Sequence, residues 1–366
     1  MRILVLSTAN SLTPSARLLV SVGAGLAERG HQTVVACCRN SASEREIARR
    51  FPSMTRRAVS GGNSIARGAS TRGIVRSLQS DVVLVATERD QLAGALGIGR
   101  TGGVVRRLAI GERYAPSWRA RLANARSRCL LFGDEIGPVV HTELHVRNAV
   151  SWPPLRVAIP GESPLRLAPV VPPSVLAIVA GTATGATGAM EHAAGAAALR
   201  AAARLLSRHP GLRVILLGDV SSLQALRLHA ASVGLVDCVS IQPLDALIDP
   251  GPFEAAGVWV TASGDTGAVS VLSAMMRRIP VIVPRGFDTE ALVAPRITGV
   301  VSDDTDLSGS VAALAQLLAD TEEHHAVGAA AAARAERLHG WDAMLRRMED
   351  TLSRVAGRGQ SRRAAA

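Results

Sequence analysis

Short aliphatic runs alternate with helix-forming segments along this chain, and the alternation occurs in two successive series. The first series predicts strands at 2–6, 32–38, 82–85, 104–110 and 129–132, and the second at 175–179, 213–217, 237–241, 258–261 and 281–283. Runs of Val, Leu and Ile without interleaved polar residues are typical of parallel strands that helices cover on both faces. The pattern therefore predicts an α/β protein with two parallel sheets.

A proline-rich stretch separates the two series. Seven of the 18 prolines fall between 151 and 174, a density that neither a helix nor a central strand accepts. We predict an N-terminal Rossmann-like domain over 1–168 and a C-terminal Rossmann-like domain over 169–340. A helix over 341–356 carries one apolar stripe and is expected to pack back on the first domain. Residues 357–366 are expected to form a disordered basic tail.

Positive charge is concentrated in the first half of the chain. Residues 1–174 hold 24 Arg and 11 acidic residues, a net charge of +13, whereas residues 175–366 hold 17 Arg and 19 acidic residues, a net charge of −2. Clusters occur at 49–50, 56–57, 106–107 and 119–128. An anionic lipid headgroup or a phosphorylated substrate fits such a surface, and a merely solvated basic surface is the alternative. Nucleic acid is not expected, because few aromatic residues are present for base stacking.

The first residues and the cysteines indicate a cytoplasmic protein. Residues 2–6 resemble a first strand rather than a signal peptide, and no apolar run reaches the length of a membrane span. Cys37, Cys38, Cys129 and Cys238 form no zinc or redox motif and are expected to be free thiols.

The stretch 257–283 predicts a strand, a short loop of small residues, a helix and a second strand. Asp265 and Thr266 stand where the helix begins, and Pro280 ends it. A helix N-terminus of this kind attracts anions, although Asp265 taken alone is better explained as a helix cap. The loop 181–188, GTATGATG, also follows a strand and precedes a helix. Its N–H groups and Thr hydroxyls are suited to cradle phosphates, and an unselected flexible loop is the alternative.

Four other motifs are not interpreted as sites. The GxGxxG match at 97–102 follows a helix-like segment and precedes a strand, the reverse of a dinucleotide-binding turn. The HTELH run at 141–145 lacks the HExxH spacing, the EEHH run at 322–325 fits one helix face, and Asp306 of the DTD run fits a helix cap. No metal site is predicted.

Read in order, the chain resembles the GT-B-fold glycosyltransferases of the large family 4 (group 1) type over about residues 2–355. The opening strand and helix with its "ERGHQTVV" turn, the strand "SDVVLVAT" and the passage "LRVAIPGESPLRLAP" match family motifs. In the second half, "RVILLGDV", "VGLVDCVSI", the stretch 257–283 and "TGVV" at 298–301 match the family's motifs in the same order.

The resemblance implies two Rossmann-like domains facing across a cleft, with a nucleotide-sugar donor bound mainly by the second. It implies Asp265 as the catalytic residue that holds a donor-sugar hydroxyl, without a metal or a cofactor. The expected donor-binding residues are Gly181, Thr182, Thr184, Thr187, Gly188, Asp265, Thr266, Gly267, Ala268, Val269, Ser273 and Glu290.

The chain departs from the family at several charged positions. No Arg or Lys lies between Gly181 and Leu199, where the family has an Arg and a Lys, and Ser273 replaces a Glu that holds the nucleotide ribose. The family's His in the first domain corresponds to Ile110. Loss of one such electrostatic donor costs about 3 kcal/mol of transition-state stabilisation.

Two functions follow from these observations. The first is sugar transfer from a nucleotide sugar to an unidentified acceptor, with the retention of anomeric configuration that the family implies. The acceptor is expected to be lipid-phosphate-linked or otherwise anionic and close to a membrane, so the protein would lie in the cytoplasm or at the inner face of the membrane. The second is a catalytically inactive GT-B homologue that serves as a binding or partner subunit in a glycan pathway. The sequence leaves the donor sugar and the oligomeric state open.

Overall fold

The structure is a computed structural model of the 366-residue chain. It describes residues 1–10, 14–60, 62–99, 102–107, 117–126, 128–132, 175–179, 199–200, 203–204, 206–207, 213–218, 223–237, 239–244, 247, 255–262, 264–286, 288–302, 312 and 320–363. The chain divides into two compact units, Met1–Arg156 with Asp342–Ala366 and Val157–Trp341. The predicted boundary at 168/169 lies outside the described residues and stays a prediction.

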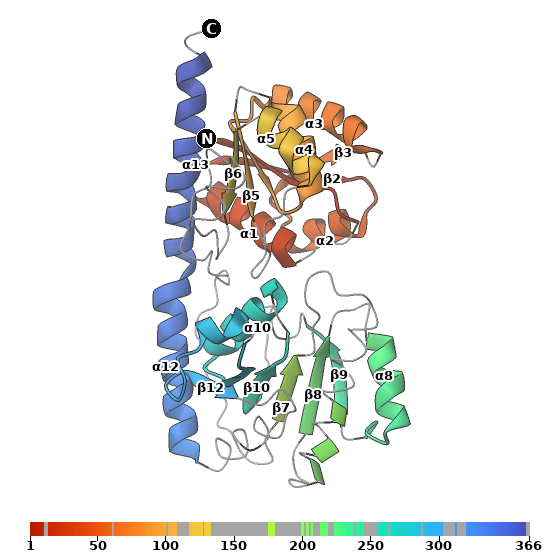
Figure 1. Ribbon diagram of the computed structural model, residues 1–366, viewed down its shortest axis with the longest axis vertical. Helices are drawn as coiled ribbons and strands as arrows, with labels where there is room; N and C mark the ends of the chain where they lie inside the picture. Colours follow the sequence, from red (N-terminus) through yellow and green to blue (C-terminus); the bar gives the residue numbers. More distant parts are fainter. Residues whose placement is uncertain are drawn as a thin grey trace. The chain divides into compact units, whose positions relative to one another are not determined.

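The first unit contains a six-stranded sheet in the order β3-β2-β1-β4-β5-β6 (Figure 1), and all of its paired strands run parallel. The strands are β1 (Arg2–Ser7), β2 (Gln32–Cys38), β3 (Thr55–Val59), β4 (Val82–Val85), β5 (Gly103–Arg107) and β6 (Arg128–Phe132). The helices are α1 (Pro14–Glu28), α2 (Ala42–Arg50), α3 (Ser64–Leu78), α4 (Glu88–Ile98) and α5 (Trp118–Arg126). Successive strands add on one side of β1 and then, from β4, on the other, which makes the β1/β4 boundary a topological switch point.

Helices cover both faces of this sheet. Leu4, Leu6, Val83, Val85 and Val104 share one buried cluster with apolar residues of α3, α4 and α5. On the other face α1 approaches closely enough that a Cβ on Gly23 would lie 2.9 Å from Val5 Cγ2. The unbroken aliphatic runs of the sequence are explained by this double cover.

The first unit differs from the sequence-based expectation in two places. The strand β3 was not predicted, because it contains Arg56 and Arg57 and exposes four of its five residues at the edge of the sheet. Arg106 and Arg107 were predicted as a surface cluster, and this was wrong: they are 5% and 1% exposed. Their strand, β5, lies between β4 and β6 inside the sheet, where helices cover it.

The second unit repeats the strand order of the first. Its sheet runs β12-β11-β10-β7-β8-β9, which is the order 3-2-1-4-5-6 again when its strands are counted from β7. The strands are β7 (Val175–Val179), β8 (Arg213–Gly218), β9 (Val239–Pro243), β10 (Gly257–Val260), β11 (Val281–Pro284) and β12 (Gly299–Ser302). The described helices are α8 (Leu223–Ser232), α10 (Gly264–Met276), the 3-10 helix η1 (Asp288–Leu292) and α12 (Thr321–His339). The switch point of this sheet lies between β7 and β10.

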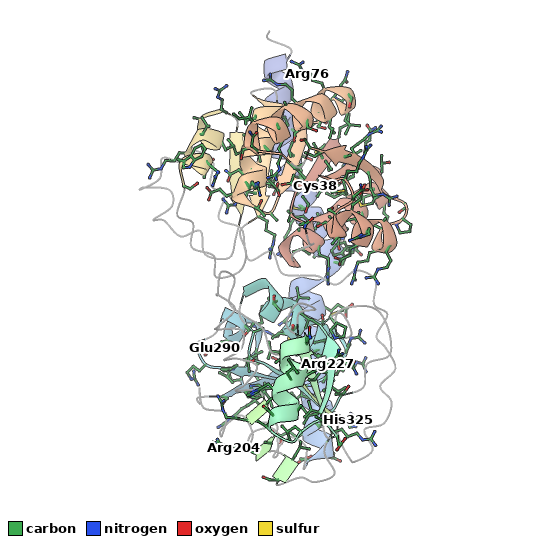
Figure 2. The ribbon with its side chains drawn as sticks, turned by 90° about the vertical axis from the view of Figure 1, so that its right-hand side faces the viewer. Cys38, Arg76, Arg204, Arg227, Glu290 and His325 are labelled. Carbon is green, nitrogen blue, oxygen red and sulfur yellow. The ribbon has the colours of Figure 1, made fainter. Side chains whose placement is uncertain are left out.

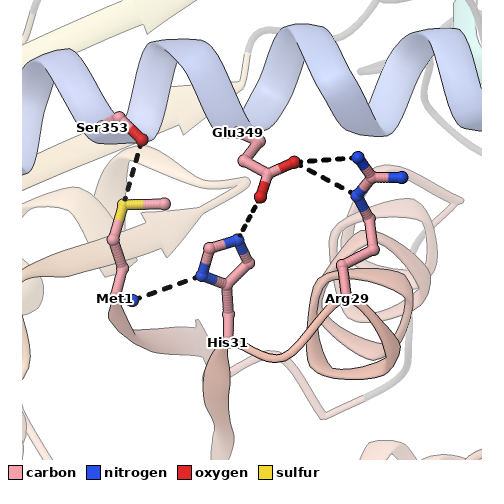
Figure 3. A network of polar contacts seen from close by, with 5 residues as sticks. All are labelled: Met1, Arg29, His31, Glu349 and Ser353. Atoms are coloured by element: carbon pink, nitrogen blue, oxygen red, sulfur yellow. Dashed lines mark hydrogen bonds and ion pairs between the residues drawn. The ribbon is translucent and has the colours of Figure 1, made fainter.

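The last helix, α13 (Trp341–Arg363), packs on the first unit. Glu349 Oε2 accepts a hydrogen bond from Arg29 Nε at 3.1 Å, and Glu349 Oε1 lies 2.7 Å from His31 Nε2 (Figure 3). His31 Nδ1 lies 3.2 Å from the amino group of Met1. The His31 ring therefore links Glu349 of α13 to the amino group of Met1.

This helix is longer than predicted. Residues 357–363 were expected to belong to a disordered tail, and this was wrong, because the helix continues to Arg363. Gly357 and Gly359 are weak helix formers, but Arg, Gln and Ser between and after them are acceptable ones. Seven helical residues therefore follow the predicted end of the helix.

Candidate functional site

The helix α10 begins at the carboxyl edge of the second sheet, at the β7/β10 switch point. Val260, the last residue of β10, pairs with Val179, the last residue of β7. The segment 181–188 and the helix α10 therefore follow neighbouring parallel strands at the same edge. Residues 181–188, including Gly181, Thr182, Thr184, Thr187 and Gly188, lie outside the described residues, so their contacts stay predictions.

The helix α10 begins close against the end of β10. Gly264 is buried and has φ +62, a left-handed conformation that favours Gly. A Cβ on Gly267 would lie 2.1 Å from Ala262 O and 2.7 Å from Thr289 Cγ2, so no side chain fits there. The first turn of α10 is thereby held to the strand end, where the positive end of the helix dipole attracts anions.

The other predicted residues of α10 take several positions. The side chain of Asp265 lies outside the described part, Thr266 is half-buried, and Thr266 O accepts a hydrogen bond from Ser270 Oγ at 2.7 Å. Ala268 and Val269 are 0% and 8% exposed, and any contact of theirs with a donor stays a prediction.

Ser273 stands where the resembling family has a Glu. It is 0% exposed, and its Oγ makes no hydrogen bond with the described residues. An unpaired hydroxyl in the interior costs about 1–3 kcal/mol. Contact between Ser273 and a ribose stays a prediction, and it would require neighbouring side chains to move aside.

Glu290 closes the turn after β11. Its Oε2 accepts a hydrogen bond from Gly286 N at 2.8 Å, and its Oε1 accepts one from Arg285 Nη1 at 3.2 Å. Glu290 is labelled on the second unit in Figure 2. The carboxylate therefore shapes a loop of the same sheet edge and orients Arg285.

Arg285 is a candidate site residue that was not predicted from the sequence. It directly follows β11, and its side chain is 56% exposed. Val258 pairs with Val281 and Trp259 with Ile282, so continuing this register places Arg285 level with Ala262, just before α10. An Arg next to a strand end and a helix N-terminus is well suited to bind a phosphate. The motif Pro284-Arg285-Gly286 after a buried strand was the available signal.

The switch point of the first sheet carries a different set of side chains. Thr8, after β1, donates from its backbone N to Asp90 Oδ2 at 3.3 Å and from Oγ1 to Asp90 Oδ1. Cys38 Sγ, at the end of β2, contacts Thr8 O at 3.4 Å (Cys38 is labelled in Figure 2). Asp90 is 1% exposed, and this burial raises its pKa. The hydrogen bonds from Thr8 and Thr87 and the charge of Arg67 act in the opposite direction and offset only part of the increase.

Further polar side chains, from α4 and β5, contact one another beside Asp90 along this edge. Arg106 Nη1 donates to Gln91 Oε1 at 3.1 Å and lies 3.8 Å from Glu88 Oε2. These side chains come from α4 and β5, so the edge holds an internal polar network rather than an open basic surface.

The structure explains two of the four motifs that were not interpreted as sites, because these two lie in described residues. A helix precedes the GxGxxG match and a strand follows it, which confirms the reversed order. Cβ atoms on Gly97 and Gly102 would lie 2.7 Å from Thr71 Cγ2 and 2.6 Å from Asp81 O, so these glycines permit close packing. His324 of the EEHH run contacts Ala256 O and anchors α12. The HTELH and DTD runs lie outside the described residues.

Within the described parts of the chain, no group of three or more His, Cys, Asp or Glu is placed to hold a metal ion. The described helices also include none with the length and hydropathy needed to cross a bilayer. That the protein needs no metal or cofactor stays a prediction.

The two sheets with the same strand order define a GT-B fold, and solved structures of this fold cover nearly the whole chain. A sucrose-phosphate synthase from Thermosynechococcus elongatus matches with a TM-score of 0.69 and 12% identity, over 97% of this chain and 99% of that one. HepE from Anabaena, in complex with UDP and glucose, matches with a TM-score of 0.68 and 14% identity, over 96% and 99%. A glycosyltransferase from Rickettsia africae matches with a TM-score of 0.70 and 10% identity, over 97% and 98%.

No protein-family profile matches the sequence. No curated protein sequence matches it either. At 10–14% identity the structural likeness shows the fold alone.

Proposed function

We propose that this protein is a glycosyltransferase that takes a sugar from a nucleotide-sugar donor and transfers it to an acceptor with retention of anomeric configuration. The second unit binds the donor and the first unit binds the acceptor. The observation that carries the proposal is the start of α10, which is held against the end of β10 by Gly267 at the switch point of the second sheet. In open α/β sheets, ligands bind outside the carboxyl ends of the strands at such a point.

The chemistry of the site fits a departing nucleoside diphosphate. Negative charge grows on the leaving group during transfer, so positive partial and full charges must already be in place. The N–H groups of the first turn of α10 and the guanidinium of Arg285 supply them from adjacent strands. Asp265 holds a hydroxyl of the donor sugar. The solved complexes of HepE contain UDP or UDP-glucose, which supports a nucleoside diphosphate as the ligand class.

The acceptor side is proposed to take an anionic molecule in the cytoplasm or at the inner face of the membrane. Exposed arginines of the first unit, such as Arg56 and Arg57 on β3, support an anionic acceptor. Burial raises the pKa of the Cys37 thiol to about 11, so this free cysteine is protonated and unreactive at neutral pH. A buried free thiol is typical of a reducing compartment.

A second function is favoured by one observation. Ser273 brings no charge to the helix that carries a Glu in the resembling family, and it is fully buried. A GT-B homologue that binds a nucleotide or a partner without transfer chemistry accounts for this position. Binding without turnover is the result that this alternative predicts.

Calorimetric titration of the whole protein with uridine, guanosine and thymidine diphosphates, followed by product analysis with their sugar conjugates, tests the proposal. We expect micromolar binding of one diphosphate and hydrolysis or transfer of its sugar. Asp265→Ala should abolish transfer and leave the thermal unfolding midpoint unchanged. Absence of binding to every diphosphate would reject donor binding, and binding without any turnover would favour the partner-subunit function.

A further inference from the structure

The helix α5 turns its large apolar side chains outward. Ala120 and Ala123 are its fully buried residues, and Asn124 Oδ1 accepts a hydrogen bond from Gln91 Nε2 of α4 at 3.0 Å. Trp118 and Leu122 are 63% and 38% exposed. An ordinary surface helix buries its Leu and Trp and exposes small or polar residues, so this arrangement is the reverse of the usual one. The buried alanines and the Gln91–Asn124 hydrogen bond hold this helix to the first unit, whereas its two large apolar side chains are exposed.

Trp118 and Leu122 lie on one face because residues four positions apart are neighbours on a helix. Arg119, Arg121 and Arg126 are also exposed, and the helix contains no acidic residue. The guanidinium carbon of Arg119 lies 5.0 Å from the Trp118 ring, a cation–π contact. We call Trp118, Arg119, Arg121, Leu122 and Arg126 the α5 face.

The neighbouring helix layer continues the same surface chemistry. The helices α3, α4 and α5 cover one side of the first sheet, and α3 contains no acidic residue. Ile65, at the start of α3, is 76% exposed, and Arg72 and Arg76 are exposed farther along (Arg76 is labelled in Figure 2). Arg89 of α4 is exposed as well. Exposed apolar and cationic side chains thus also occur on the two helices beside α5.

We infer that the α5 face docks the first unit onto an anionic lipid bilayer. An aromatic ring and an aliphatic side chain flanked by arginines match the interface between headgroups and acyl chains, where Trp is enriched. The arginines supply charge complementarity to anionic headgroups, and each basic residue near such a surface strengthens binding about fivefold. The helix would lie in the plane of the interface rather than cross the bilayer.

Other occupants fit the α5 face less well. A second copy related by twofold symmetry would bring together two α5 faces that each carry three arginines and no acidic residue, and like charges repel. A nucleic acid would match the arginines and stack on Trp118, but it offers no apolar environment for Leu122. The bilayer alone satisfies both the apolar and the cationic side chains.

This inference goes beyond the transfer reaction and does not depend on it, because bilayer binding requires no sugar donor. Its test is sedimentation of the full chain with vesicles of phosphatidylcholine alone or of phosphatidylcholine mixed with phosphatidylglycerol. We expect binding to the mixed vesicles only, and weaker binding at high salt because salt screens the arginine–headgroup attraction.

Variants separate the two contributions. Arg119→Gln/Arg121→Gln/Arg126→Gln should weaken binding to the mixed vesicles about a hundredfold. Trp118→Ser/Leu122→Ser should weaken it roughly tenfold or more, because the buried apolar area is lost. A matched control on the other unit is Arg227→Gln/Leu228→Ser, which removes an exposed Arg and a 67% exposed Leu from α8 and should bind like the wild type.

Thermal unfolding of each variant establishes that the first unit remains folded, which is expected because every changed side chain is exposed. Wild-type binding that both α5 variants retain would overturn the inference. Absence of wild-type binding would also overturn it, as would a concentration-dependent dimer that only Trp118→Ser/Leu122→Ser abolishes. That last result would identify the α5 face as a protein interface.

Discussion

The carboxyl edges of the two sheets share a topology and differ in chemistry. Both sheets have the strand order 3-2-1-4-5-6, and in both a helix follows the fourth strand at the switch point, α4 in the first and α10 in the second. The start of α4 carries Glu88 and Asp90 in its first turn, and Asp90 is buried in hydrogen bonds from Thr8. The acidic side chains of Glu88 and Asp90 therefore offset the positive end of the α4 dipole.

The start of α10 is built from small residues instead. Gly264 and Gly267 bring the helix close to the strand end, and Asp265 is the only acidic residue in its sequence. An exposed cation of this edge, Arg285, lies after the next strand. The same topology therefore provides one edge whose helix start buries a hydrogen-bonded carboxylate and one edge whose helix start is built from glycines near an exposed arginine.

The largest effect on ligand binding is expected from filling the space at the start of α10. Gly267→Val places a side chain within 2.1 Å of Ala262 O, so the helix start must move away from the strand. Overpacking costs about 1–3 kcal/mol of unfolding free energy, and we expect nucleotide diphosphate binding to fall below detection. Calorimetric titration and thermal unfolding measure the two effects.

Gly328→Val is the matched control in the same unit. Its Cβ would lie 2.2 Å from Arg278 O, so a similar loss of stability is expected, but it stands on α12 away from the carboxyl edge. At a temperature where both variants are folded, Gly328→Val should bind the nucleotide like the wild type. Equal affinities of the two variants would show that α10 has no special role.

A smaller effect is expected from the cation of the same edge. Arg285→Ala removes a charged hydrogen-bond donor, and such bonds contribute about 1.5–3 kcal/mol, or roughly ten- to a hundredfold in diphosphate affinity. Arg213→Ala is the control, because Arg213 is exposed at the opposite, amino end of β8. A nucleoside without phosphates should bind both variants alike. If Arg213→Ala weakened binding as much as Arg285→Ala, the assignment of the phosphates to this edge would be wrong.

The sheets themselves could be predicted from sequence, whereas the chemistry of the first edge could not. Periodicity placed β2, β4 and β7 at their observed bounds, because runs such as Val82–Val85 are buried on both faces. The strand β3 was missed because an edge strand tolerates exposed Arg and carries little apolar pattern. The contact between Thr8 and Asp90 joins residues 82 positions apart, so it exists only once β1 and β4 pair.

The sequence predicted only part of the candidate site, because the rest depends on which strands pair. The resemblance to a known fold directed attention to Asp265 and the loop 181–188, but Arg285 becomes a candidate only through the register of β10 with β11. The burial of Arg106 and Arg107 depends on β5 being an inner strand, which the sequence of β5 does not encode by itself.

The buried carboxylate of the first edge provides a pH-dependent prediction. Burial raises the pKa of Asp90 above its ordinary value, so the folded protein binds this proton more tightly than the unfolded chain does. Stability contributed by the protonated form is present at low pH and is lost as the pH rises through the raised pKa. We expect Asp90→Asn, which is neutral at every pH, to gain stability relative to the wild type from acidic to neutral pH. Thermal unfolding across this range measures the difference, and a gain confined to acidic pH would contradict the assigned cause.

The smallest expected effect is that of Glu349 on α13. Its pKa is lowered, whereas that of Asp90 is raised. The hydrogen bond from His31, followed by the contacts with Arg29, lowers the pKa of this partly exposed carboxyl, so the folded protein binds its proton less tightly than the unfolded chain. Its stabilisation is present above the ordinary Glu pKa and is lost as the pH falls through the lowered one. Exposed ion pairs contribute only about 0.5 kcal/mol, so Glu349→Gln should loosen α13 slightly at neutral pH and not at acidic pH.

Amide hydrogen exchange along α13 measures this directly, with Glu336→Gln on the exposed side of α12 as the control. If exchange rose equally at both pH values, packing rather than charge would hold this part of the helix, and the contrast between Asp90 and Glu349 would not be electrostatic.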